Sequence, residues 1–597
     1  MNIFRPAITN LSVIAILFSS GLVAQQTMAM HNHESMSDSA CISEWAKPIE
    51  LFSAEKIGTL SHPVSTKSEK AQLYFNQGLT FYYGFDSLSA MRSFHAASEA
   101  DNKLAMAYWG VALAAGGDLN IPINDPCMKL AIQQSKLALL YKEAASEADK
   151  LYVNAIAVRY GTDISAAPAD RDPAQLSVPF MLAMRGAYEK LFLQSPTPDP
   201  DVAALYAVAL MNLRPWLWWT TDGKPSNEIT LALSALETGL RNPKIKDHLG
   251  LNHFYIHATE EAPMEVALRA LPSAQRLMEL APERTSHLRH MPAHTFLRAG
   301  MWPQVVAANE RAVAADKWWA DQCTASIVAP QCNQLLVGHY SSHDMLFLAV
   351  GLNNQGLWDK TQNIAEQTEA NATRFLKTQP DLEHYLTTRA MMAAHFGKWE
   401  YLAALPKPQS PMPDPHASAY CSQLHYKLET AIWYFGQTMA DAQFKRSTRE
   451  NLYAFNQASA CSANANQGWG NNAAASILAV VHWRLLARIA QKEGRTADSV
   501  EDARLAVEME DLLDYDEPPG WYIYSRETLG AALLRANKAD EALEVFEQDL
   551  AAHPNDSRSL FGRWQALLAK HSPDAQKAGT EFKAQWLGSD YPSLDDM

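Results

Sequence analysis

A spacing of small and aromatic residues, present at both ends of the chain, limits the fold more than any other feature of the sequence. Near the start, Gly78 and Ala90 lie where the two helices of an antiparallel hairpin would cross closely, with Phe81 and Phe94 to fill the layer between them. No segment alternates polar and apolar residues for long enough to form a sheet. The sequence therefore predicts an all-α fold of stacked helical hairpins.

The same residue types recur at the spacings that define the tetratricopeptide repeat (TPR). In the first unit they are Tyr74, Gly78, Phe81, Ala90, Phe94 and Ala97. In a unit near the C-terminus they are Leu529, Gly530, Leu533, Ala542, Phe546 and Pro554. A degenerate unit runs from Ser286 to Asp316, with Gly300-Met301-Trp302 as the turn between its helices. The chain thus resembles the TPR superfamily, which implies an α-solenoid, or superhelix, with a concave working surface.

Further phrases resemble a group of large exported bacterial TPR proteins whose activity is not established. These phrases are Phe75-Asn-Gln-Gly78, Ala107-Tyr-Trp-Gly110, Leu213-Arg-Pro-Trp216, His253-Phe-Tyr-Ile-His257, His290-Met-Pro-Ala-His294 and Pro518-Pro-Gly-Trp521. They span most of the chain that follows the N-terminal leader, and they imply the fold alone.

Other amphipathic segments predict helices between the repeat units, at residues 128–156, 179–193, 201–213, 227–240, 265–280 and 476–492. Proline-rich connections fall at 195–200 and 406–415, and the second is expected to divide the array into two lobes. We therefore expect a loosely ordered leader at 30–65, an N-terminal array at 66–405 with a His-rich groove, and a C-terminal array at 416–597.

The N-terminus has the composition of a signal peptide. Arg5 precedes an apolar stretch from Leu11 to Ala24, too short to span a bilayer, and small-residue cleavage patterns end at Ala24 and Ala29. We expect residues 1–29 to be removed and the protein to be periplasmic or secreted, with an uncleaved anchor helix as the alternative. No later apolar run approaches the length of a membrane span, so the mature chain is expected to have none.

Charge and cysteine content narrow the class of protein further. A net charge of −15 argues against a nucleic-acid partner, which requires a basic surface. The six cysteines contain no CxxC pair, and an even number in an oxidising compartment favours disulfides. Cys323 with Cys332 and Cys421 with Cys461 are plausible pairs, although the sequence cannot select among the possible pairings.

Three HxxxH pairs lie between residues 253 and 343: His253/His257, His290/His294 and His339/His343. Residues four apart on a helix share one face, so the two imidazoles of such a pair can bind one metal ion. If Pro292 starts a new helix, however, His290 moves to the cap and the second pair no longer shares a face.

The TPR register indicates where these side chains point. With Gly300 as the turn residue, His287, His290 and His294 fall at positions that face the concave groove in the TPR family, and Arg298 follows one turn later. The turn at Gly356 places His343 inward as well. Either Glu260 or Glu261 shares a face with His253 and His257.

Imidazoles with a nearby carboxylate suit copper, zinc or iron and not calcium or magnesium. We predict His253, His257, His290, His294 and His343 as metal ligands, with His287, His339, Arg298, Glu260 and Glu261 as further groove residues. A leader tract of Met28, Met30, His31, His33 and Met36 is soft enough for copper, unless it is a disordered remnant of the processed N-terminus.

The sequence thus predicts an exported TPR binding protein with a His-lined concave site that holds a transition metal. One alternative is a metal-free scaffold that captures peptides or protein partners in the groove for envelope assembly. A second alternative is a metal-dependent enzyme that uses the same histidines, although no known hydrolase, zinc-protease or nucleotide-binding motif accompanies them.

Overall fold

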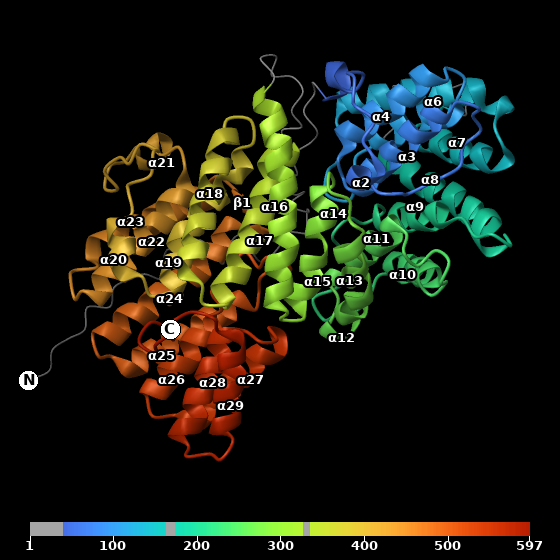
Figure 1. The fold of residues 1–597 in the computed structure, drawn as a ribbon. Helices are drawn as coiled ribbons and strands as arrows, with labels where there is room; N and C mark the ends of the chain where they lie inside the picture. Colours follow the sequence, from blue (N-terminus) through green and yellow to red (C-terminus); the bar gives the residue numbers. More distant parts are fainter. Residues whose placement is uncertain (1–39, 163–172, 326–334) are drawn as a thin grey trace, which may run out of the picture. The chain divides into compact units, whose positions relative to one another are not determined.

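The computed structural model describes residues 40–162, 173–325 and 335–597, and it confirms the all-α prediction. Helices pack against their neighbours in sequence as antiparallel hairpins (Figure 1). Within the described residues, the only strands are β1 (Gly468–Trp469) and β2 (Asn472–Ala473), a short antiparallel pair. No described helix has both the length and the apolar composition that crossing a membrane requires.

The first helices are η1 (Ala40–Glu44), α2 (Ala54–Ile57), α3 (Glu69–Tyr83), α4 (Ser87–Ala100), α5 (Ala105–Ala114), α6 (Asp125–Tyr141), η2 (Lys142–Ala144) and α7 (Glu147–Arg159). Next come α8 (Pro173–Tyr188), η4 (Glu189–Leu193), α9 (Pro200–Met211), α10 (Asn227–Leu240), α11 (Leu249–Glu260), α12 (Met264–Ala267), η5 (Leu268–Ala270) and α13 (Leu271–Leu280).

The middle of the chain forms α14 (Ser286–His290), α15 (Pro292–Arg298), α16 (Trp302–Ala325), η7 (Leu336–Tyr340), α17 (Ser341–Asn354), α18 (Trp358–Phe375), η8 (Pro380–Thr387), α19 (Thr388–His395) and α20 (Trp399–Ala404). The last helices are α21 (Tyr420–Gln423), α22 (Lys427–Gln443), α23 (Arg449–Asn464), α24 (Ala474–Lys492), α25 (Thr496–Glu510), α26 (Ser525–Arg535), α27 (Ala539–Ala552), α28 (Ser557–Ala569) and α29 (Ala575–Gln585).

One packing arrangement recurs at both ends of the array. The Phe94 ring on α4 lies against Gly78 of α3 and Gly110 of α5, where an added Cβ would come within 2.8 Å and 2.4 Å of ring atoms. The Phe546 ring on α27 lies in the same way against Gly530 of α26 and Gly562 of α28, at 2.4 Å and 2.2 Å. Each ring occupies the space that two side chains would otherwise fill, which confirms the closely crossing helical hairpins that the spacing of small and aromatic residues predicts.

The expected turns are also present, whereas some helices differ from the prediction. Gly300 and Gly356 adopt φ values of 63° and 74° between consecutive helices, a conformation that favours glycine. The helix predicted at 128–156 is two helices, because the Ser146 side chain caps the start of α7. The helix predicted at 265–280 is divided into α12, η5 and α13, and a proline begins the last of these.

Residues 40–65 are held firmly to the array, so the expectation of a loosely ordered leader is wrong for the part that the structure describes. Cys41 forms a disulfide with Cys127 of α6, and Phe52 makes edge contacts with Phe81 and Trp319. The earlier part of the leader, its Met/His tract and the signal peptide lie outside the described residues. The Cys421–Cys461 disulfide is present as predicted, whereas Cys332 of the other expected pair is outside the described residues.

His62 anchors the end of this segment in a buried polar network. Its Nδ1 lies 2.8 Å from Asp201 Oδ2, and the Tyr83 hydroxyl donates to Asp201 Oδ1 at 2.6 Å. His248 Nε2 also lies 2.9 Å from Asp201 Oδ1. Burial lowers the pKa of His62, but Asp201, Asp199 and Asp149 outweigh that effect and raise it to about 9.

The proline-rich connection at 406–415 does not divide the hydrophobic core. One cluster of buried residues runs from Ala40 to Ile523, and a second runs from Ala487 to Met597. The chain end closes against the array, because Lys492 pairs with Asp595 at 2.6 Å and Trp399 Nε1 donates to Asp596 at 2.9 Å. The division into two arrays at this connection stays a prediction.

The Gly110→Ala substitution tests the packing around Phe94. We expect it to lower the melting temperature, since overpacking a core costs about 1–3 kcal/mol. Gly186→Ala in α8 is the matched control, because nothing lies within 4 Å of an added Cβ there. Melting followed by circular dichroism should show a lower temperature for the first variant alone, and equal melting of the two would contradict the packing.

The pH dependence of stability tests the His62 network. Because the folded pKa is raised, the contribution of His62 is complete below its unfolded value of 6.5 and is lost as pH rises through about 9. We expect the melting temperature of wild type to exceed that of His62→Gln at pH 6, and this difference in melting temperature to shrink by pH 10. A difference in melting temperature that stays constant from pH 6 to pH 10 would exclude a charged His62.

Candidate functional site

Six histidines from four helices converge inside the array. His253 and His257 lie one turn apart on α11, His287 and His290 lie on α14, His294 lies on α15, and His343 lies on α17. Helix α16 packs against α14, α15 and α17, which brings these helices together (Figure 1). Their rings form a continuous series, with His287 and His290 centroids 6.1 Å apart and those of His257 and His294 6.2 Å apart.

The first group, called trio 1, consists of His253, His257 and His287. Each residue offers one ring nitrogen, and these three atoms lie within 4.8 Å of one another. His253 Nε2 and His287 Nε2 are 3.2 Å apart. The Phe85 ring stacks on His257 and His287 at centroid distances of 5.5 Å and 4.8 Å, so an apolar face covers the trio.

Hydrogen bonds fix which nitrogen atoms of trio 1 are free. His253 Nδ1 lies 2.7 Å from the Tyr83 carbonyl, which can only accept, so this nitrogen carries the proton. His257 Nδ1 donates in the same way to Glu260 Oε1 at 2.7 Å. The Nε2 of His257 is buried without a hydrogen-bond partner. Burial holds the pKa of His253 and of His287 well below the usual histidine value, so both rings are neutral.

Trio 2 consists of His290, His294 and His343. The His290 and His294 Nε2 atoms are 2.8 Å apart, although Pro292 begins a new helix between them. Met291 keeps helical dihedrals, so the chain continues its turn and the two rings still meet. The His343 ring centroid is 4.8 Å from that of His290. The alternative in which Pro292 separates this pair is therefore excluded.

The protons of the His290–His294 pair are also constrained. His290 Nδ1 donates to Asn309 Oδ1 at 2.7 Å, because the amide nitrogen of Asn309 donates to Val305. Two carboxylate oxygens flank His294 Nδ1, from Glu260 at 3.0 Å and Glu517 at 2.7 Å. Both Nδ1 atoms thus carry protons, and the two close Nε2 atoms must share either one further proton or a cation.

The electrostatics indicate which of the two rings carries the further proton. Burial lowers the pKa of His294, but Glu260 and Glu517 outweigh it and raise the value to about 10. Burial holds the pKa of His290 well below its usual value. His294 is therefore the cation, and it donates Nε2–H to His290. Against the raising effect of burial, His257 and His294 lower the pKa of Glu260 to about 2.

Behind His290 lies a pair of buried carboxyl groups. Burial raises the pKa of Asp316 to about 7 and that of Asp344 well above its usual range. Asp344 Oδ1 is 3.2 Å from His290 Nδ1.

The site is enclosed, which corrects the expectation of an open concave groove. His253, His257, His287 and His290 are each at most 2% exposed, and His294 is 6% exposed. The segment between α25 and α26 fills the space that a groove would leave, because it brings Glu517 onto His294 and Tyr515 beneath Arg298. Only His343 is partly accessible.

Three predicted groove residues lie outside the two trios. Arg298 donates to the carbonyl oxygens of Glu260 and Ala262 and so closes the end of α11. Glu261 points away from the histidines, toward the backbone of Trp218 and Trp219, and burial raises its pKa to about 8. His339 contacts Tyr385 and is absent from both groups of ligand atoms among the described residues.

Sequence reasoning missed several residues of the site. Glu517 lies in a proline-rich loop far along the chain, and no local pattern links it to His294. Asn309 and Asp344 likewise come from neighbouring helices. The helical period could have indicated Asp344, which directly follows His343, but not its protonation.

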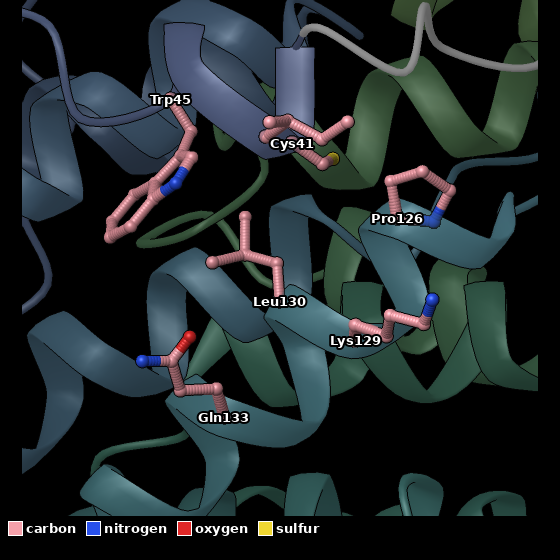
Figure 2. Close-up of a pocket in the computed structure, with 7 residues that line it drawn as sticks. Cys41, Trp45, Pro126, Lys129, Leu130 and Gln133 are labelled. Carbon is pink, nitrogen blue, oxygen red and sulfur yellow. The ribbon is translucent and has the colours of Figure 1, made fainter. Parts of the chain in front are cut away.

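Two other features of the described structure are less suited to binding a metal ion. His62, Asp199 and Asp201 could hold a cation, yet hydrogen bonds already engage Asp201 on both oxygens. A surface hollow between η1 and α6 (Figure 2) is lined by Cys41, Ile42, Trp45, Pro126, Lys129, Leu130 and Gln133. It offers one lysine and no histidine or carboxylate, so it provides no set of metal ligands.

Comparisons with known proteins add little to this geometry. No protein-family model matches the sequence, and no curated protein matches it. Among solved structures, the chain is similar to yeast Tom70, with 12% identity, a TM-score of 0.27, and coverage of 87% of this chain and 92% of that one. It is also similar to the APC/C hetero-tetramer Cut9-Hcn1, with 14% identity, a TM-score of 0.26, and coverage of 87% and 94%. At such TM-scores these likenesses carry no argument about function.

Proposed function

We propose that this protein is an exported helical-repeat protein that binds transition-metal ions within its buried histidine cluster. The observation that carries the proposal is the arrangement of trio 1. The Nδ1 atoms of His253 and His257 donate to fixed acceptors, which leaves their Nε2 lone pairs available to a metal ion, and His253 Nε2 lies 3.2 Å from His287 Nε2. An imidazole oriented in this way by a carbonyl or carboxylate is the usual protein ligand for copper, zinc or iron.

The distances in the cluster suit such ions. A metal ion ~2.0–2.1 Å from each nitrogen could bind two imidazoles whose nitrogens are about 3 Å apart. The closest pairs are 3.2 Å apart in trio 1 and 2.8 Å apart in trio 2. Without an ion, a buried nitrogen such as His257 Nε2 has no partner, which is costly in a protein interior.

Export is supported by the disulfides. Cys41–Cys127 and Cys421–Cys461 are both formed, and such bonds persist in oxidising compartments. They agree with the signal-peptide composition of residues 1–29. We therefore assign the protein to the periplasm or the extracellular space.

A metal-free peptide scaffold is less favoured at this site. A peptide must reach the side chains that recognise it, whereas five of the six imidazoles are at most 6% exposed. Metal ions need far less access, and His343 is a partly exposed route to the cluster. A protein partner could still bind elsewhere on the helical array.

Metal analysis of protein purified without a His-tag tests the proposal. We expect stoichiometric copper, zinc or iron in wild type, and loss of at least one ion in the His257→Ala/His287→Ala double variant. His482→Ala is the control, because this histidine bonds Asn456 on α23 and belongs to neither trio. Wild type that retains no metal after reloading, while remaining folded by circular dichroism, would contradict the proposal.

Glu260→Gln tests the role of the carboxylate that orients His257. Removing such an outer partner usually weakens metal affinity about 10- to 100-fold. Glu261→Gln is the matched control, since the neighbouring residue faces the Trp218–Trp219 backbone. Competition with a chelator of known affinity should show weaker binding for Glu260→Gln only. Equal affinities for the two variants would show that Glu260 does not support the site.

A further inference from the structure

The histidine cluster is accessible to solvent on one side only. His253, His257, His287 and His290 are at most 2% exposed, whereas His343 of trio 2 is partly exposed. Of the six histidines in the trios, His343 is thus the one that an ion from solvent meets first.

Two further histidines, called the outer pair, lie near His343. They are His339 on η7 and His384 on η8, and both are partly exposed. His339 precedes His343 by four residues, and η7 continues into α17 with helical dihedrals at Tyr340 and Ser341. Residues four apart on a continuous helix lie on the same side, so His339 and His343 follow each other along one face. In addition, η7 is a π-helical turn, an uncommon form that is frequent at functional sites.

Packing of η7 against the start of η8 brings the outer pair together. An added Cβ at Gly338 would lie 2.3 Å from Oε1 of Gln379, the residue that directly precedes η8. The Tyr385 ring centroid lies 4.0 Å from that of His384 and 6.3 Å from that of His339. The two imidazoles therefore lie against one aromatic ring.

Each outer imidazole has a nitrogen that an ion can use. His384 Nδ1 lies 2.8 Å from the Asp381 carbonyl, which can only accept, so the lone pair of this ring is on Nε2. His339 Nδ1 is buried without a hydrogen-bond partner. Burial first, then the two other histidines of trio 2, and then His339 and His384 lower the pKa of His343, which agrees with the closeness of the outer pair.

The outer pair differs from the trios in the number of ligands that it offers. Among the described residues, neither of its imidazoles belongs to a group of three ligand atoms within 4.8 Å of one another, whereas His343 belongs to trio 2. An ion with one or two imidazoles and water is held less tightly than an ion with three imidazoles. An ion bound at the outer pair would therefore move on to trio 2.

We propose that the outer pair, His339 and His384, is the entrance through which transition-metal ions pass to His343 and so into trio 2. This inference rests on the proposed metal-binding function and adds the route that supplies it. At each step the ion exchanges water or one imidazole for the next imidazole, and no electron is transferred. Because the outer imidazoles release the ion once it has reached the trio, they change the rates of entry and exit and not the final affinity.

The experiment follows metal uptake by the full chain after a chelator has removed bound metal. Zn²⁺, Cu²⁺ and, anaerobically, Fe²⁺ are offered separately, samples taken over time are passed through a chelating resin, and the metal retained per chain is counted. We expect His339→Gln/His384→Gln to take up and release metal ~10-fold more slowly than wild type, since association rates of related variants span ~1–3 decades. Competition with a chelator at equilibrium should give the affinity of wild type.

The variants separate a ligand role from a packing role. Glutamine keeps much of the size and polarity of histidine but has no ring nitrogen, so slow uptake in the double variant reports the loss of a ligand. His416→Gln is the matched control, because His416 is exposed, stacks on Tyr453 and belongs to neither trio, and its variant should keep wild-type rates. His384→Ala, which leaves His339 in place, should also slow uptake and keeps the test decisive if the double variant fails to fold.

The outcomes distinguish this inference from the function on which it rests. Wild-type uptake rates in the folded outer-pair variants would overturn the entrance and leave metal binding in place. A loss of equilibrium affinity in these variants would make the outer pair part of the final site, which also overturns the entrance. If folded wild type takes up none of the three ions, both the inference and the proposed function are wrong.

Discussion

Hydrogen bonds to the Nδ1 atoms of the buried histidines are the interactions on which the site depends. A neutral imidazole has one N–H and one lone pair, so an acceptor placed at Nδ1 determines that the lone pair is on Nε2. The Tyr83 carbonyl does this for His253, Glu260 does it for His257, and Asn309 does it for His290. The backbone and side chains around the cluster thereby select the nitrogen that each ring presents to the interior.

Burying these imidazoles and carboxylates costs free energy of folding. Imidazoles and carboxylates lose hydration when they are buried, and a buried polar atom without a partner is unfavourable. One proton between the Nε2 atoms of His290 and His294 satisfies both of these atoms, whereas His257 Nε2 has no hydrogen-bond partner in the protein. A structural role would be served as well by apolar side chains, since replacing buried polar groups with apolar ones is often neutral or stabilising.

Local sequence patterns predicted the helical hairpins and part of the histidine cluster, but not the carboxylates that reach it from distant segments. The spacing of Gly78 and Phe94 identified the hairpin, because helix crossing depends on residues that are near in sequence. The HxxxH spacing likewise identified the His253/His257 and His290/His294 ring pairs, whereas His339 of the third pair lies outside both trios of the described structure. It did not choose between Glu260 and Glu261, and it did not reveal Glu517, since that carboxylate reaches His294 from a loop beyond α25. The same loop fills the expected groove, and a repeat register contains no information about such an insertion.

The N-terminal segment illustrates how a distant part of the chain supports the cluster. His62 and the Tyr83 hydroxyl both bind Asp201, and His248 binds the same carboxylate from the start of α11. Tyr83 thus connects two interactions, since its side chain bonds Asp201 while its carbonyl fixes the tautomer of His253. Loss of the segment that carries His62 would remove one partner of a buried carboxylate, and such carboxylates are strongly destabilising when left unpaired. The position of α11, and with it the orientation of trio 1, therefore depends on residues that a TPR consensus would place outside the array.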